Sequence, residues 1–402
     1  MEKALGDLIV IEVAHAWAGP LTGMYFADMG AEVIKIERPG LGDLQRSPLA
    51  HGPCVEDENL VFLFLNRNKK GITLDLRSKK GQDIFKSMVA KADIVIENFV
   101  PGTFDKWGLG YDVLSGINPA LIMVSVSGFG QTGPYREQAA FDLVIQAISG
   151  MMSVTGFPDQ PPVRCGAAIA DHLGGLFGFV GALIALHWRN KSGQGQWVDA
   201  SLLESTLITL GDRFVRYAQF GDTSDLISQV GNRYPGMGRA GCYKTRDGYL
   251  TFRAASEGGA AKLAKIVGRE DLINGDEDKA FLNTYKLFEG ELGNALEIFL
   301  EDKTKKEALE ILNEAGVACA PVLGIDELME DPQFKEREMI VDVEHPVVGK
   351  MKMMGAVPKL SKTPGTVRSA GPSLGQHNEE VFSNLLNYTR EKIDHLKKEK
   401  II

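Results

Sequence analysis

Continuous apolar runs alternate with amphipathic stretches along the first 130 residues. Residues 8–14 read LIVIEVA, an apolar run typical of a parallel strand that is buried on both faces. Further strands are predicted at 31–40, 71–76, 92–99 and 121–127. A short helix ending near Gly30 follows the first strand, and a helix with Ser78 as its N-cap is predicted at 78–92. This alternation predicts βαβ units and a parallel sheet covered by helices.

Such sheets bind their ligands at the carboxyl ends of the strands. In this chain those ends are residues 15–20, 38–43, 98–106 and 128–135. We therefore expect the functional site to be built from these four segments.

The pattern changes in the second half of the chain. Residues 139–188 are predicted to be helical, and the segment from 192 to 210 leads into another helix. From about residue 222 the sequence is polar and rich in turns. Strands are then predicted at 249–254 and 317–322, with helices near 258–267, 280–299 and 304–315, and strand signals return before a final helix near 377. We expect a large domain from 1–224 joined by the returning segment 331–402, and a small α/β domain at 225–330.

Composition excludes several classes of function. The 402 residues include 44 basic and 53 acidic side chains, a net charge of −9, which argues against nucleic acid as a partner but allows local phosphate sites. The four cysteines are far apart without a CxxC pair, and the seven histidines lack metal-ligand spacing. The N-terminus does not resemble a signal peptide, and the apolar run at 176–186 is too short to span a bilayer. We expect a cytoplasmic protein with no metal and no membrane partner.

One carboxylate stands out at the start of an apolar stretch. Asp171 lies in CGAAIADHLGGLFG, and the residues after it have the spacing of a buried helix. Aspartate is a favoured N-cap, and a helix N-terminus would also keep its carboxylate ionised, as a nucleophile requires. The glycines Gly174, Gly175 and Gly178 could admit a bulky ligand or serve close helix packing. From these residues alone, capping and chemistry both remain open.

Several cations follow predicted strands. Arg38 ends the second strand beside Glu37, where a dinucleotide fold has its ribose-binding acid, but the G-x-G-x-x-G motif is missing after the first strand. Arg38 could instead bind a phosphate or be a solvated rim residue. The same two alternatives apply to the cations Arg67, Lys69, Lys70 and Lys106.

Two further glycines lie between a strand and a helix. Gly258 and Gly259 are either part of an ordinary loop or part of a mobile flap whose N–H groups face a reacting carbonyl. A G-x-S-x-G nucleophile elbow does not occur in the sequence.

Landmarks throughout the chain resemble the class III CoA-transferase family, which includes formyl-CoA and carnitine CoA-transferases and also α-methylacyl-CoA racemases. They are HAWAGPLTGMYFADMGAEVIKIERPGLGD, NRNKKGITLDL, IENFVPGTFDKWGLGYD, SGFGQTGPY, GQGQWVDASLLES and PSLGQHNEEV, in the family's order. The resemblance implies an α/β fold with a Rossmann-like large domain, a smaller inserted α/β domain, and an interlocked dimer.

The resemblance also implies roles for particular residues. Asp171 would be the nucleophile, with Gly258 and Gly259 near the oxyanion. CoA would lie along His15, Trp17, Ala18, Arg38, Leu74, Asp75, Leu76, Arg77, Asn98, Phe99 and Lys106. Substrate would contact Phe141 and Asp142, and no bound cofactor would be needed besides the CoA thioester substrate.

Position 141 separates the activities within this family. The racemases of this family have a sequence similar to GHD where this chain has Phe141. They use that histidine with an aspartate to move the proton α to the thioester, whereas Phe141 cannot accept a proton. Formyl-CoA transferases have Gln at position 17, Tyr at 141, Glu at 142 and a four-glycine flap. Trp17 and Phe141 therefore favour a larger and more apolar acyl group than formate or oxalate.

We accordingly expect a CoA-transferase that moves CoA from an acyl-CoA donor to a free carboxylic acid. Succinyl-CoA and an aryl-substituted or branched acid such as benzylsuccinate are the expected pair, and Asp171 would form an anhydride and then a CoA thioester. The alternatives are an α-methylacyl-CoA racemase and a non-catalytic CoA-binding subunit. The chain would act as a homodimer or pair with a homologous subunit.

Overall fold

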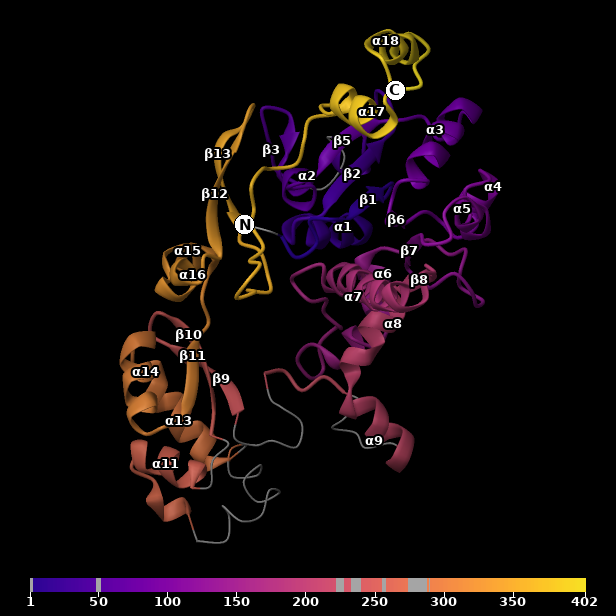
Figure 1. Cartoon of the computed structure of the whole chain (residues 1–402). Helices are drawn as coiled ribbons and strands as arrows, with labels where there is room; N and C mark the ends of the chain where they lie inside the picture. The colour runs from indigo at the N-terminus through magenta and orange to yellow at the C-terminus, as the bar shows by residue number, and fades with distance from the viewer. Residues whose placement is uncertain are drawn as a thin grey trace. The chain divides into compact units, whose positions relative to one another are not determined.

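The structure is a computed structural model of the chain, and it describes residues 3–47, 52–221, 228–232, 240–254, 258–273, 288 and 290–402 (Figure 1). The chain divides into two compact units. The first contains Met1–Ser149, Gly166–Thr209 and Pro332–Ile402, and the second contains Gly150–Cys165 and Leu210–Asp331. The predicted domain limits at 224/225 and 330/331 stay a prediction, because a compact unit need not fold independently.

A six-stranded parallel sheet forms the centre of the first unit. Its strands are β1 (Ile9–Glu12), β2 (Glu32–Glu37), β5 (Lys70–Thr73), β6 (Ile94–Glu97), β7 (Ile122–Ser127) and β8 (Trp197–Ser201). Every neighbouring pair is parallel. The parallel sheet and its first five strands are confirmed, but the sequence pattern missed β8. This edge strand is partly exposed, so it lacks the apolar run of a central strand.

The strand order places a ligand crevice near the middle of the sheet. The order is β5-β2-β1-β6-β7-β8, so the chain runs outward from β1 in one direction and then outward from β6 in the other. In doubly wound folds the crevice opens at this change of direction, beyond the carboxyl ends of the strands. Here that position lies between the loops that follow β1 and β6.

Helices cover both faces of this sheet. One face packs against α1 (Ala18–Asp28), α6 (Asp142–Ile148), α7 (Ile169–Ser192) and α8 (Leu202–Leu207). The other face packs against α3 (Lys79–Val89), α4 (Thr103–Lys106), α5 (Tyr111–Ile117), α17 (Asn378–Leu386) and α18 (Arg390–Lys398). The region predicted as one final helix from 377 is therefore two helices, α17 and α18.

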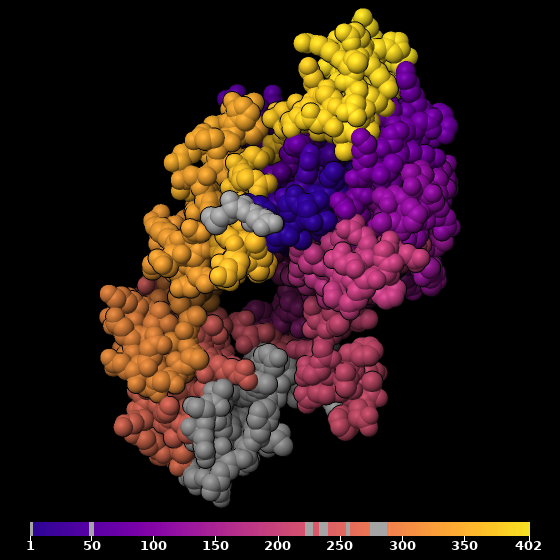
Figure 2. All heavy atoms as spheres, viewed as in Figure 1, coloured from indigo at the N-terminus to yellow at the C-terminus, as the bar shows by residue number. Residues whose placement is uncertain are grey.

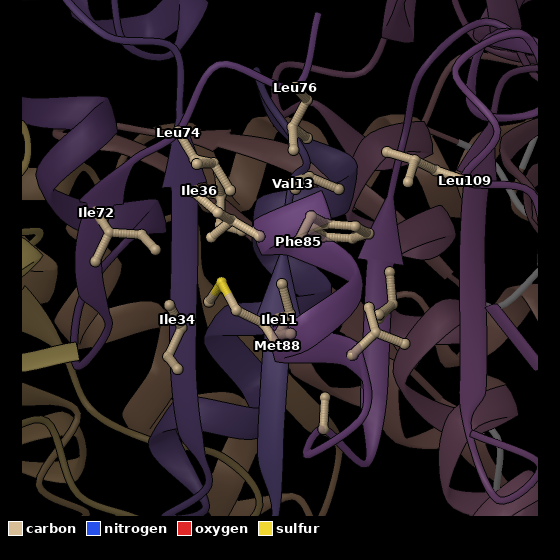
Figure 3. Close-up of a cluster of buried hydrophobic side chains, with 14 of the residues drawn as sticks. Ile11, Val13, Ile34, Ile36, Ile72, Leu74, Leu76, Phe85, Met88 and Leu109 are labelled. Atoms are coloured by element: carbon tan, nitrogen blue, oxygen red, sulfur yellow. The ribbon is translucent and has the colours of Figure 1, made fainter. Parts of the chain in front are cut away.

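Helix α3 illustrates how the sequence builds this core. Ser78 is its N-cap, as predicted, and accepts a hydrogen bond from the N–H of Gly81. Figure 3 shows Phe85 and Met88 of α3 beside side chains from the strands, such as Ile11 and Ile36. Burying a side chain of this size contributes about 1.5–3 kcal/mol.

The C-terminal segment returns to the sheet of the first unit. After α16 (Pro332–Glu336), strands β12 (Ile340–His345) and β13 (Gly349–Met354) form an antiparallel hairpin. The segment then follows β5, where the Gly71 N–H donates to His377 Nδ1 at 3.0 Å and the Thr73 N–H donates to Asn378 Oδ1 at 2.8 Å. Figure 2 shows the yellow C-terminal atoms against the indigo and purple N-terminal ones. The short elements β3 (Cys54–Val55), β4 (Glu58–Asn59) and α2 (Leu60–Leu65) also belong to this unit.

The second unit contains a small antiparallel sheet with the order β11-β10-β9. Its elements are β9 (Ala240–Thr245), β10 (Gly248–Arg253), α11 (Gly259–Ile266), α13 (Glu291–Glu301), α14 (Lys305–Glu314) and β11 (Ala318–Pro321), with α9 (Asp212–Phe220) and α15 (Ile325–Glu330). The predicted strands near 249 and 317 are confirmed. The sequence pattern missed β9, and most of the helix expected at 280–299 lies outside the described residues.

The stretch 139–188, predicted to be helical, is helical only in part. Residues 155–168 contain no helix and separate α6 from α7. Within the described residues, the 24-residue α7 alone has the length and composition that could cross a membrane. It packs instead on α1 and on the sheet of the first unit, which is the position of a core helix.

Candidate active site

Asp171 lies in the first turn of α7, where it is not the N-cap. The N-cap is Ala168, and the helix begins at Ile169, so the predicted capping role of Asp171 is wrong. As the third residue of the helix, Asp171 has its own N–H at the open helix end. Its carboxylate has no hydrogen bond to another described residue. The Asp171 side chain therefore makes no capping hydrogen bond to the helix.

A second aspartate caps α7 from outside. Asp142 is the first residue of α6, and its Oδ1 accepts hydrogen bonds from Ala170 N at 2.8 Å and Asp171 N at 3.4 Å. Its Oδ2 accepts from Gln146 Nε2 at 2.6 Å. Of the two predicted substrate residues, Asp142 thus binds the backbone of the helix turn that carries Asp171, and Phe141 precedes Asp142 with 70% of its surface exposed.

The environment of Asp171 raises its pKa. Burial, followed by the negative charge of Asp142, raises the pKa of Asp171 from 3.8 to about 7. The helix end therefore does not keep the pKa of this carboxylate low, because burial, and after it the charge of Asp142, raises that pKa. Above pH 7 the carboxylate is ionised and more basic than an ordinary aspartate, which favours nucleophilic attack.

The glycines of α7 serve close packing. A Cβ on Gly175 would lie 2.7 Å from the carbonyl oxygen of Ala18, and one on Gly174 would lie 2.6 Å from Leu202. Gly178 similarly approaches Thr22, whose Oγ1 donates to the carbonyl of Gly175 at 3.0 Å. Of the two alternatives left open by the sequence, these contacts support helix packing against α1 and α8.

A cavity of about 440 Å³ opens at the carboxyl ends of β1, β2 and β5. Seven of the eleven residues expected to bind CoA line it together: His15, Arg38, Leu74, Asp75, Leu76, Arg77 and Phe99. Its apolar wall continues the core in Figure 3, because Val13, Ile36, Leu74 and Leu76 belong to both. Arg38 and Arg77 are exposed at the cavity and form no ion pair with a described residue. Unpaired guanidinium groups beside an apolar slot suit a ligand with phosphates and a flat ring.

The other four expected CoA residues lie outside this cavity lining. Asn98 is bonded to the backbone of His15, whose N–H donates to Asn98 Oδ1 at 2.8 Å and whose carbonyl accepts from Asn98 Nδ2 at 2.7 Å. Ala18 begins α1, and Trp17 immediately precedes it. Lys106 is the last residue of α4 and is exposed.

The turn between β1 and α1 contacts both the cavity and helix α7. His15 lines the cavity and packs on Phe99 with ring centroids 5.2 Å apart. Two residues later, Trp17 packs on His172, the neighbour of Asp171, with ring centroids 5.9 Å apart. The same short turn thus has His15 at the cavity and Trp17 against the first turns of α7.

Three cations that the sequence offered as phosphate ligands have structural partners instead. Arg67 is buried and its NH2 lies 2.6 Å from Asp28 Oδ2. Lys69 is buried against Glu12 at 2.7 Å, and Lys70 pairs with Glu32 and Glu380 at 2.8 Å. Arg67 and Lys69 are buried in these pairs and Lys70 is partly buried, so each of the three charges already has a carboxylate partner within the protein.

Glu37 also has a structural partner. Its carboxylate accepts from Arg46 Nε at 2.7 Å and NH2 at 2.9 Å, and from the N–H of Asp43 at 2.9 Å. This arrangement fixes the loop after β2 and does not leave Glu37 available for a ribose.

Gly258 and Gly259 belong to the second unit. Gly258 precedes α11 with φ +74°, and a Cβ on Gly259 would lie 2.6 Å from the carbonyl oxygen of Ala254. Both positions need glycine for backbone reasons. Residues 255–257 of the expected flap lie outside the described residues, so the oxyanion role of the two glycines stays a prediction.

Sequence reasoning missed the buried charges beneath the cavity. Lys35 and Asp43 are paired at 2.8 Å, and Lys35 is also 3.0 Å from Glu12 Oε1. The available signal was a lysine inside the second apolar strand and an aspartate closing the motif RPGLGD. A lysine at the centre of a buried strand requires a partner, which the periodicity alone does not name.

The family comparison now decides between the classes of protein. The family model for CoA-transferase family III matches residues 5–378. The chain belongs to CoA-transferase family III.

Individual relatives agree with this membership. The chain is 39% identical over 401 residues to succinyl-CoA–D-citramalate CoA-transferase of Chloroflexus aurantiacus, covering 100% of this chain and 98% of that one. It is 34% identical over 408 residues to the beta subunit of succinyl-CoA–L-malate CoA-transferase from the same organism, covering 99% and 98%. A crystal structure of a CaiB/BaiF family protein from Brucella suis superposes with a TM-score of 0.84 at 32% identity, covering 96% and 100%. The family III CoA-transferase reading of the sequence is thereby confirmed.

Proposed function

We propose that this family III enzyme transfers CoA from succinyl-CoA to a dicarboxylic acid, with Asp171 as the nucleophile. The observation that carries the proposal is the Asp171 carboxylate, which has no hydrogen bond to another described residue and belongs to the same unit as a cavity where Arg38 and Arg77 form no ion pair with a described residue. The names of the two Chloroflexus relatives support succinyl-CoA as donor.

The reaction needs four acyl-transfer steps. Asp171 attacks the thioester carbonyl of succinyl-CoA, and CoA thiolate leaves as an aspartyl–succinyl anhydride forms. The thiolate then attacks the aspartyl carbonyl, which releases succinate and leaves an aspartyl-CoA thioester. The acceptor carboxylate attacks this thioester to give a second anhydride and thiolate. Attack of that thiolate on the acceptor carbonyl gives the new acyl-CoA and restores Asp171.

Two side chains support a substituted acceptor. Trp17 and Phe141 flank the first turn of α7, through the contact with His172 and through the neighbouring Asp142. Citramalate and malate, which the relatives' names give, are dicarboxylic acids, as is benzylsuccinate. Aromatic side chains beside the nucleophile suit the benzyl-substituted member of this class.

A panel of acceptors tests the proposal. The purified chain is incubated with succinyl-CoA and each of citramalate, malate, glutarate, benzylsuccinate, formate and oxalate, and new thioesters are identified by mass spectrometry. We expect transfer to at least one of the four dicarboxylates with two or more carbons between the carboxyl groups. Absence of any new thioester would contradict the proposal.

The nucleophile is tested separately. Asp171→Asn keeps the size of the side chain but cannot form the anhydride, so turnover should fall about a thousandfold or more. Treating wild-type enzyme and donor with hydroxylamine should convert Asp171 to a hydroxamate, detectable in the peptide that spans 165–178. Enzyme treated without donor is the control, and an unmodified peptide from an active preparation would exclude the covalent mechanism.

A further inference from the structure

The turn between β1 and α1 holds a strained residue. Ala16 has φ +64°, in the left-handed region that side chains other than glycine seldom occupy. Such a conformation persists only where its surroundings impose it, and it is often found at functional sites. Ala16 lies between His15, which lines the cavity, and Trp17, which packs on His172, the residue after Asp171.

Two side chains hold this turn by its peptide groups. Asn98 bonds the N–H and the carbonyl of His15. Asp43 Oδ1 accepts the N–H of the strained Ala16 at 3.0 Å, together with the N–H of Gln45 at 2.9 Å. Asp43 therefore connects the loop after β2 to the turn after β1.

A buried cation fixes the Asp43 carboxylate. Its Oδ2 lies 2.8 Å from Lys35 Nζ, with the two side chains 1% and 0% exposed. Lys35 Nζ also donates to Glu12 Oε1 at 3.0 Å and to the carbonyl of Ala14 at 2.9 Å. Burial alone would raise the pKa of Asp43. The charge of Lys35 and the backbone N–H donors outweigh burial and hold this pKa below its ordinary value. The Asp43 carboxylate is thus held between the Lys35 ammonium group on one oxygen and the N–H groups of Ala16 and Gln45 on the other.

We propose that Asp43, anchored by Lys35, is a positioning residue for CoA transfer: it holds Ala16 in the left-handed conformation that directs His15 to the cavity and Trp17 to the nucleophile. Asp43 lines the cavity, but its side chain is only 1% exposed and its carboxylate is held by Lys35 and by the N–H groups of Ala16 and Gln45, so we assign its effect to the turn. This inference rests on the proposed function, because it assigns the turn a task in that reaction.

Substitutions of Ala16 test the turn without disturbing the buried charges. Glycine adopts φ +64° freely, whereas a β-branched side chain is an outlier there. We expect Ala16→Gly to keep kcat within about threefold of wild type, and Ala16→Val to lower kcat about tenfold or more while the protein stays folded. Wild-type kcat in Ala16→Val would overturn the proposal.

Substitutions of Asp43 test the side chain itself. Asp43→Asn keeps an oxygen for the Ala16 N–H, whereas Asp43→Ala removes it, so kcat should be higher in the Asn variant than in the Ala variant. Asp28→Ala is the matched control, because it breaks the buried pair with Arg67 that does not contact the turn. We expect both alanine variants to lower the melting temperature, but only Asp43→Ala to lower kcat. If Asp43→Ala and Asp28→Ala changed kcat equally, Asp43 would have only a structural role and the proposal would be overturned.

Calorimetric measurement of CoA binding tests the role of Asp43 independently of the proposed transfer reaction. Asp43→Ala should weaken CoA binding about fivefold or more through the displaced His15, and this readout needs no acceptor acid. If wild-type protein binds CoA but transfers it to no acid on the panel, the proposed function fails while the binding comparison still tests the turn. If wild type is active and both Asp43→Ala and Ala16→Val match it in kcat and CoA affinity, only the positioning role fails.

Discussion

The proposed nucleophile, Asp171, shows how a single ionisable residue can oppose the stability of the fold. Its folded pKa of about 7 lies above the value of 3.8 that applies to the unfolded chain. Between these two pH values the native state binds the extra proton, so stability falls as pH rises through the window, and the full penalty remains above pH 7. Asp171 is thus more costly to the fold at the pH values where it is ionised and reactive.

Replacing Asp171 by asparagine should therefore stabilise the protein while abolishing transfer. We expect Asp171→Asn to raise the melting temperature by about 1–3 °C at pH 8 and to have almost no effect near pH 4. Thermal unfolding of both proteins across this range measures the difference. The exposed residue Asp302 provides a control, since Asp302→Asn should show no such dependence on pH. A melting temperature that falls at pH 8 would show that the carboxylate supports the fold.

The second acid at this helix end should set the pH range of the reaction. Asp142→Asn keeps an oxygen for the N–H of Ala170 but removes the negative charge that raises the pKa of Asp171. The rise of kcat/KM with pH, centred near 7 in the wild type, should then move down by about 0.5–1 unit. Steady-state kinetics between pH 5 and 9 measures both midpoints. An unchanged midpoint would mean that burial alone raises the pKa of Asp171.

Helix packing places this carboxylate, and the glycines of α7 are the tightest part of that packing. Gly175 meets the backbone of Ala18 and the side chain of Leu21, so an added methyl group has no space to enter. Since Ala18 begins α1, a displacement there moves the Trp17 end of the turn as well as the first turn of α7.

Gly175→Ala should therefore lower both stability and turnover. Overpacking of this kind typically costs about 1–3 kcal/mol of the free energy of unfolding. Gly116 in α5 is the matched control, because a Cβ there meets nothing within 4 Å. Chemical denaturation and transfer assays of Gly175→Ala and Gly116→Ala compare the two sites. Equal behaviour of the two variants would mean that α1 and α7 adjust to the extra methyl group.

Helices and strands could be predicted from the sequence where their signals come from residues close together in the chain. The central strands are apolar because both of their faces are covered, and Ser78 caps α3 through a contact only three residues away. Strands β8 and β9 are edge strands with partly exposed patterns, so periodicity did not reveal them.

The site depends on contacts that join distant segments, and these were only partly predictable. Asp142 binds the N-terminal backbone of a helix that begins 27 residues later. Asp171, the N-cap expected from the sequence, is not the N-cap, and the charge of Asp142 contributes to its raised pKa. Lys35, Asp43 and Ala16 meet through the order of the strands. Seven of the residues that the family resemblance selected for CoA line one cavity, whereas generic rules for loop cations also selected Arg67 and Lys69, which are buried in ion pairs.

At the scale of the whole molecule, the outer face of α7 is apolar and exposed, as expected of a surface that binds another subunit. Leu176, Phe177, Val180, Ile184 and Trp188 recur along this helix and are each 38–64% exposed. Contiguous apolar surface of this kind is costly in water and commonly marks an interface. Because the helix carries Asp171 at its start, an interface along it would also restrict solvent around the nucleophile.

We expect this surface to be covered by a second copy of the chain. Light scattering after gel filtration should then give a dimer for the wild type, and the double variant Ile184→Glu with Trp188→Glu should shift the mass toward the monomer, because two charges would be buried without partners. Ile298→Glu, at a site 72% exposed on α13 of the second unit, is the matched control and should leave the mass unchanged. A wild-type monomer with full transferase activity would contradict the expectation. A monomer that gains activity only with a homologous subunit would instead place a different chain on the same face of α7.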